Sequence, residues 1–168
     1  MLTVAEGDTA HSLALTGVDR RVVFIFRVYR IAHYAEPASL PALPAEGVFT
    51  DGPAKAISIL FERNLGVERI RKELEASIRR NARAEWLEAA HGTISSFMTA
   101  IDRDAVKGDR LVLYWLDGGR VFAEFNGERE FEATDPAFAK AIWSIWFGKD
   151  PVCDRDLLLA RLVTEDQQ

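Results

Sequence analysis

The sequence predicts an α+β fold, an antiparallel β-sheet with a layer of α-helices packed on one face. Turn residues at positions 117–119 (Asp-Gly-Gly) and 126–127 (Asn-Gly) separate short apolar runs, which is typical of antiparallel hairpins. Between Val67 and Ile78, apolar residues instead recur with helical spacing and charged residues fill the gaps. Strands and helices come in separate blocks along the chain, and this order favours helices gathered on one side of the sheet.

The N-terminal part predicts two strands joined by a turn. Residues 11–34 are rich in Val, Ile, Phe and Tyr, and Gly17 and Asp19 interrupt them where we place the turn. The second strand is long and covers residues 21–34. Strand alternation puts Tyr29 on one of its faces and Tyr34 on the other.

The middle of the chain predicts a loop, a strand and a helix pair. Residues 37–53 hold four prolines, which fits a surface loop, and residues 55–61 read as a buried strand. The amphipathic helix that starts near Val67 is the first of the pair. A second helical pattern follows over residues 86–101.

The last part predicts a three-strand meander over residues 110–133 and two helices after it. Asp135 can cap the first of these helices, with Pro136 in its first position and Gly148 at its end. The final helix covers about residues 154–163.

Length and charge bound the function classes. The chain has 168 residues, and we expect one domain over residues 1–168 with a core at about 11–163. The net charge of −5 disfavours a nucleic-acid partner. The apolar runs are far shorter than the roughly 20 residues that cross a bilayer, so we expect no integral membrane segment.

The N-terminus predicts the compartment. It opens with a mixed, acidic stretch that lacks the pattern of a signal peptide, so the sequence as it stands predicts a cytoplasmic protein. The alternative is a periplasmic protein whose signal peptide has been removed before Met1. The single cysteine, Cys153, excludes an internal disulfide and reads as a small apolar filler.

Two groups of motifs point to a known family. Residues 26–29 (Phe-Arg-Val-Tyr) with the later Tyr34, after a glycine-led stretch that ends in Arg21, are similar to the F-K-V-Y strand of the chalcone isomerase-like family. Near the C-terminus, residues 138–152 resemble that family's closing helix, its I-W-L-G end and the P-V before the last helix. The resemblance covers about residues 17–163. It implies that the sheet is curved and that a ligand cleft lies between the long strand and the first paired helix.

The family holds plant flavonoid isomerases, plastid fatty-acid binders and fungal haem binders, so the fold alone does not decide the function. The resemblance implies that Arg21 is the cation an isomerase uses to hold a phenolate, and Tyr29 falls where the plant enzymes carry a threonine hydroxyl. Residues 65–67 (Leu-Gly-Val) lack the hydroxyl expected before the first paired helix. We therefore expect no chalcone isomerase activity and assign no catalytic residue.

The leading hypothesis is non-catalytic binding of a small, apolar, acidic ligand such as a fatty acid, without a required cofactor. Arg21 would hold the carboxylate with help from Tyr29, and Arg27 and Tyr34 are further candidate contacts. One alternative is a haem or tetrapyrrole protein, with the histidines as candidate ligands. Another is an isomerase or lyase of unknown substrate, and a third is a scaffold whose own side chains fill the cleft. Under the haem alternative, the candidate iron ligands are His33 and His91.

Overall fold

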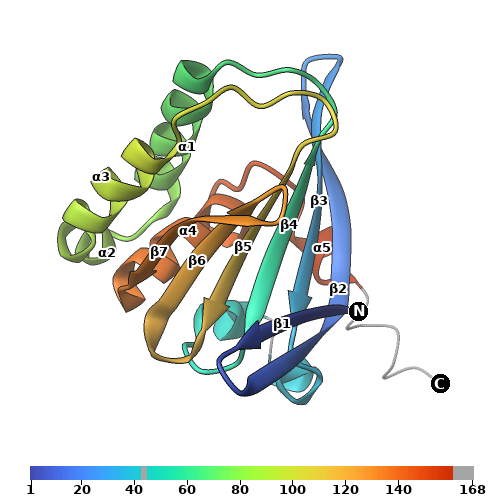
Figure 1. Cartoon of the computed structure of the whole chain (residues 1–168), viewed down its shortest axis with the longest axis vertical. Coiled ribbons are helices and arrows are strands. Elements are labelled where there is room, and N and C mark those ends of the chain that lie inside the picture. The colour runs from blue at the N-terminus through green and yellow to red at the C-terminus, as the bar shows by residue number, and fades with distance from the viewer. Residues whose placement is uncertain (43–44, 161–168) are drawn as a thin grey trace.

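The computed structural model describes residues 1–42 and 45–160, and an antiparallel sheet organises them (Figure 1). Seven strands of the described part pair in chain order, so each strand lies next to its neighbours in sequence. Three short 3-10 turns interrupt the connections: η1 (Pro37–Ala42), η2 (Ala45–Phe49) and η3 (Asp117–Gly119). The strands are β1 (Leu2–Glu6), β2 (Thr9–Val23), β3 (Phe26–Ala35), β4 (Lys55–Phe61), β5 (Arg110–Leu116), β6 (Arg120–Phe125) and β7 (Glu128–Thr134).

The helices lie over one face of this sheet (Figure 1). Three of them stand between β4 and β5: α1 (Val67–Asn81), α2 (Ala84–Ala89) and α3 (His91–Ala100). Two follow β7: α4 (Pro136–Phe147) and α5 (Arg155–Leu158). The predicted α+β arrangement is confirmed.

Helix α4 forms the centre of the main core, where it packs between the sheet and helices α1 and α2. Asp135 caps it as predicted, because its carboxylate accepts a hydrogen bond from the backbone N–H of Phe138 over 3.1 Å. Trp143 and Trp146 of α4 are almost completely buried, and Trp143 packs edge-to-face on Trp115 of β5. Such tryptophan pairs remove a large apolar area from water.

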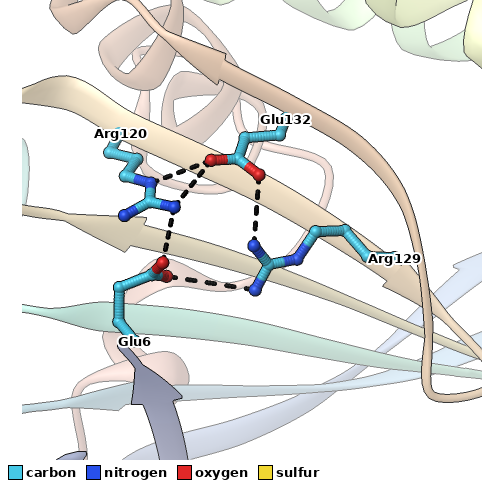
Figure 2. A network of polar contacts seen from close by, with 4 residues as sticks. All are labelled: Glu6, Arg120, Arg129 and Glu132. Carbon is cyan, nitrogen blue, oxygen red and sulfur yellow. Dashed lines mark hydrogen bonds and ion pairs between the residues drawn. The ribbon is translucent and has the colours of Figure 1, made fainter. Parts of the chain in front are cut away.

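The other face of the sheet carries a second, smaller core. β1 and the first half of β2 cross over it, so Val4 and Leu13 are buried against Tyr114 and Phe122 of β5 and β6. In Figure 2 the carboxylate of Glu6 reaches two arginines at the far end of the strand order. The sheet therefore curls strongly, as the family resemblance implies. The four residues of this ionic network are Glu6, Arg120, Arg129 and Glu132.

The predicted turn at Gly17 and Asp19 is wrong. β2 continues through both residues with a bulge beside Thr16, and the chain reverses at Phe24, whose φ is +55°. Gly17 serves a different purpose. A Cβ at this position would lie 2.1 Å from the carbonyl oxygen of Leu157, so only glycine lets the backbone of α5 approach β2 so closely.

The described part of the chain contains no helix that is long and apolar enough to cross a membrane. The last helix ends earlier than predicted, at Leu158, and positions 161–163 of the prediction lie outside the described residues.

Candidate ligand-binding cleft

A mostly apolar groove lies between α1 and the helix-covered face of the sheet. It consists of two adjoining hollows, of about 100 Å³ towards β2 and β3 and about 80 Å³ towards α3 and β7. The two hollows share four apolar lining residues from β4, α1 and β5, so they are parts of one groove. These residues are Phe61, Ile70, Leu74 and Leu111.

Hydrogen bonds at both ends of α1 hold it across this groove. At its C-terminal end, the side-chain oxygen of Asn81 accepts a hydrogen bond from the backbone N–H of Asp150 over 2.7 Å. At its N-terminal end, the backbone N–H of Val67 donates to Asp104 over 2.8 Å. Between these ends the helix faces the groove through partly buried apolar side chains. Arg71 also ties the first half of α1 to the end of α3, because its guanidinium donates to the backbone oxygen of Ile101 over 2.8 Å.

Arg21 lies at the β2 end of the groove. Its guanidinium donates one hydrogen bond to the backbone oxygen of Val152 over 2.8 Å, and it is the cross-strand neighbour of Tyr29. No carboxylate among the described residues forms an ion pair with Arg21. Because a guanidinium has five N–H donors, Arg21 can still bind an anion bidentately at the end of an apolar groove.

Tyr29 forms part of the groove wall, but protein groups already engage its hydroxyl. The phenol oxygen accepts a hydrogen bond from the indole N–H of Trp146 over 3.2 Å, and the thiol of Cys153 lies beside the hydroxyl. Burial, and then the neighbouring Cys153, raise the pKa of Tyr29 above its usual value. Tyr29 is therefore a neutral, fixed side chain at physiological pH.

Cys153 is a buried thiol next to the groove rather than a nucleophile. Burial first, and the carboxylate of Asp19 second, raise the pKa of Cys153 to about 12, against the opposing effect of Arg21. The thiolate is the reactive form of cysteine, so this side chain is inert at neutral pH.

The prediction missed three groove residues on α1, namely Arg69, Glu73 and Ser77. They recur every four residues and follow one edge of the helix. Arg69 forms no ion pair with any described residue, and the hydroxyl of Ser77 has no hydrogen-bond partner in the described part of the chain. The four-residue spacing beside Ile70 and Leu74 is visible in the sequence, but only the docking of α1 shows that this edge faces the groove.

The structure brings Arg21 and Tyr29 together but separates the other two predicted contacts from them. Tyr34 lies on the opposite face of the sheet, where it packs against the second core. Arg27 is exposed near the β2–β3 turn and lines neither hollow of the groove.

His33 is completely buried and hydrogen bonded at both ring nitrogens. Trp143 donates its indole N–H to Nε2 over 3.3 Å, so Nδ1 carries the proton and donates to the hydroxyl of Thr16 over 2.7 Å. That hydroxyl in turn donates to the backbone oxygen of Leu158 over 2.7 Å. Burial, with a smaller effect from Lys55, lowers the pKa of His33 to about 3. His33 is thus a neutral residue that connects β3, α4 and α5, with neither nitrogen free to bind iron.

His91 is exposed at the start of α3 and lines a separate hollow with Met98 and Arg79. The structure therefore does not bring the two candidate haem ligands to one site. No group of three or more His, Cys, Asp or Glu residues within residues 1–42 and 45–160 is arranged to hold a metal ion.

Comparison with known proteins agrees with this architecture. A solved structure of a fatty-acid binding protein from Arabidopsis thaliana superposes with a TM-score of 0.72 at 13% sequence identity, over 97% of this chain and 98% of that chain. No curated protein sequence matches. A family model described as chalcone isomerase-like matches residues 3–160. Since this match spans most of the sequence, the chain belongs to the chalcone isomerase-like family.

Proposed function

We propose that this protein binds a fatty acid without chemical conversion, with the apolar chain under α1 and the carboxylate on Arg21. The observation that carries the proposal is an arginine that forms no ion pair with a described carboxylate and lies at one end of an apolar groove. An arginine fork matches the two oxygens of a carboxylate, and the adjoining hollows provide apolar walls for the chain.

Two further observations support this ligand class. Arg69 at the same hollow adds a second positive charge, and Glu73 nearby leaves the site with a net positive charge. The name of the structural neighbour states that it binds fatty acids, and its fold is the same.

The groove must widen to take up such a ligand. Ligand pockets usually measure about 300–1,000 Å³, whereas the two hollows measure about 100 and 80 Å³. The middle of α1 contacts the sheet only through side chains such as Ile70 and Leu74, so we expect this part of the helix to move outward on loading. The same narrow hollows would suit a scaffold whose own side chains fill the cleft. A binding measurement distinguishes this scaffold from a fatty-acid binder.

The state of Tyr29 supports binding rather than catalysis. A hydroxyl that polarises a substrate must be free to donate its proton towards the developing charge. The Tyr29 hydroxyl is instead buried beside the thiol of Cys153 and has Trp146 bonded to its oxygen, and burial raises its pKa. Ser77 offers a hydroxyl in the groove, but no general base among the described residues hydrogen bonds to it.

Displacement of a fluorescent fatty acid by palmitate, in buffer without vesicles, tests the proposal. We expect Arg21→Gln to weaken palmitate binding by roughly ten- to a hundredfold, the usual effect of losing a charge-assisted hydrogen bond. Arg79→Gln is the matched control, since Arg79 pairs with Glu75 on the exposed face of α1. Equal affinities of the wild type and Arg21→Gln would overturn the assignment of Arg21, and no binding of any fatty acid would favour the filled scaffold.

A further inference from the structure

The turn between β2 and β3 exposes apolar side chains that a folded protein normally buries. Phe24 is 92% exposed and Ile25 is 86% exposed, and Phe26 and Val22 beside them are about half exposed. Figure 1 shows this hairpin tip standing beyond the loops that connect β4 to α1 and α3 to β5. Contiguous exposed apolar residues of this kind mark a contact surface.

The backbone at the tip is also unusual. Phe24 has a φ of +55°, a left-handed conformation that glycine or asparagine normally provides in a hairpin turn. A bulky aromatic residue gains nothing in the fold from this position, because its side chain packs on almost nothing. The tip therefore carries a local strain and an exposed ring together, a combination that points to a function.

Arginines surround the tip although the whole chain is acidic. Residues 20–30 contain four arginines and no acidic residue, in a protein of net charge −5. Arg27 follows the turn and forms no ion pair in the described part of the chain. Arg63, from the neighbouring loop, lies over the ring of Phe26 at 4.7 Å. Glu62 is the acidic residue beside them, and it is paired with Arg20.

The same hairpin forms the wall of the candidate cleft. Val23 and Val28, directly before and after the turn region, line the hollow that also holds Arg21. Arg21 lies three residues from Phe24, a distance of about 10 Å along a strand. Interfacial apolar segments bury themselves about 5–10 Å into a bilayer surface, so a tip inserted to that depth would bring the cleft to the lipid headgroups.

We propose that the β2–β3 tip docks the protein on a lipid bilayer that contains anionic lipids, with Phe24 and Ile25 inserted and Arg27 and Arg63 facing the headgroups. The tip is the narrow end of a two-stranded hairpin, whereas a specific protein interface uses a broad surface of roughly 800 Å² per partner. Aromatic and aliphatic side chains with flanking arginines suit the apolar and anionic layers of a membrane surface. This docking does not depend on which ligand the cleft binds.

Co-sedimentation with vesicles tests the proposal directly. We expect the wild type to bind vesicles of phosphatidylcholine with phosphatidylserine, more weakly at high salt, and to bind pure phosphatidylcholine less. The double variant Phe24→Ser with Ile25→Ser should bind at least tenfold more weakly. Leu157→Ser, which changes a half-exposed apolar residue on α5, is the matched control and should bind as the wild type does.

A label at the tip gives a second readout. Because the native Cys153 is buried and inert, a cysteine introduced as Ile25→Cys can be labelled selectively with an environment-sensitive dye. Its emission should shift to the blue with the anionic vesicles. Failure of the wild type to bind these vesicles, or equal binding by the double variant, would overturn the proposal, as would self-association of the wild type that the double variant abolishes. Palmitate binding without vesicles is measured on the same variants, so a failure of the cleft assignment is seen separately.

Discussion

Arg21 connects β2 to the segment before α5, because its guanidinium donates a hydrogen bond to the backbone oxygen of Val152 over 2.8 Å. The two residues are 131 positions apart in the chain. The same side chain is thus both the candidate ligand-binding cation and a structural contact, and its two roles can be measured separately.

Arg21→Ala should lower the free energy of unfolding by about 1 kcal/mol, because the Val152 oxygen loses a hydrogen-bond donor in a partly buried place. Urea denaturation measures this change. Arg27→Ala is the control on the same hairpin, and we expect it to change stability by less than about 0.5 kcal/mol. Equal effects of the two variants would contradict the structural role of Arg21.

Stability should depend on pH through His33. The pKa of His33 is lowered to about 3 in the folded protein, from 6.5. As the pH falls below 6.5, the unfolded chain binds a proton at His33 that the folded protein does not, so stability is greatest above pH 6.5. It should decrease towards pH 5 by at most about 1.4 kcal/mol per pH unit.

Urea denaturation at pH 5 to 7 measures this slope above the range in which carboxylates titrate. His33→Gln should flatten the slope, even if it lowers stability at every pH. His91→Gln, at an exposed site, should leave the slope as it is. An unchanged slope in His33→Gln would show that another group titrates.

Gly17→Ala should destabilise the protein by about 1–3 kcal/mol, because the added Cβ overlaps the backbone of α5. Gly92→Ala is the opposite case, since a Cβ there meets no atom within 4 Å and alanine favours the helix. We expect it to stabilise by up to about 1 kcal/mol. Thermal denaturation of both variants is the test, and a neutral Gly17→Ala would mean that α5 does not approach β2 so closely.

Glu6→Gln should loosen β1 without unfolding the rest of the sheet. The change removes the carboxylate that joins β1 to Arg120 and Arg129, at a cost of about 0.5–1 kcal/mol for a partly exposed network. Hydrogen exchange should become faster in the amides of β1 while those of β4 and β5 stay protected. Equal acceleration across the sheet would show that this network holds more than β1.

Local signals predicted the second half of the fold well. Asn126 and Gly127 both adopt positive φ in a tight hairpin turn, and Asp135 caps α4, so short-range chemistry decides these features. The first half depends on distant contacts. Gly17 suggests a turn in the sequence, but in the structure it allows the backbone of α5 to lie close to β2. The actual turn, at Phe24, contains no residue that typically forms turns.

The candidate site was predicted only in part, because some of its residues are placed by strand pairing and others by contacts between distant elements. Arg21 and Tyr29 are direct cross-strand neighbours, so motif and strand pairing agree. Tyr34 is five residues from Tyr29, and alternation alone places it on the other face of the strand. The contributions of Arg69 and Ser77 depend on how α1 lies on the sheet, and no spacing within the helix reveals that.

The pairing of the strands in chain order also bears on how the molecule assembles. Most neighbouring strands are joined by a short connection, so their hairpins need little loop closure to form. Residues 36–54 separate β3 from β4, and the longest connection, residues 62–109 with three helices, separates β4 from β5. Closing a longer loop has a larger entropic cost and slows folding. We therefore expect the two halves of the sheet to form first and their union at β4 and β5 to be the late step, which also completes the floor of the groove.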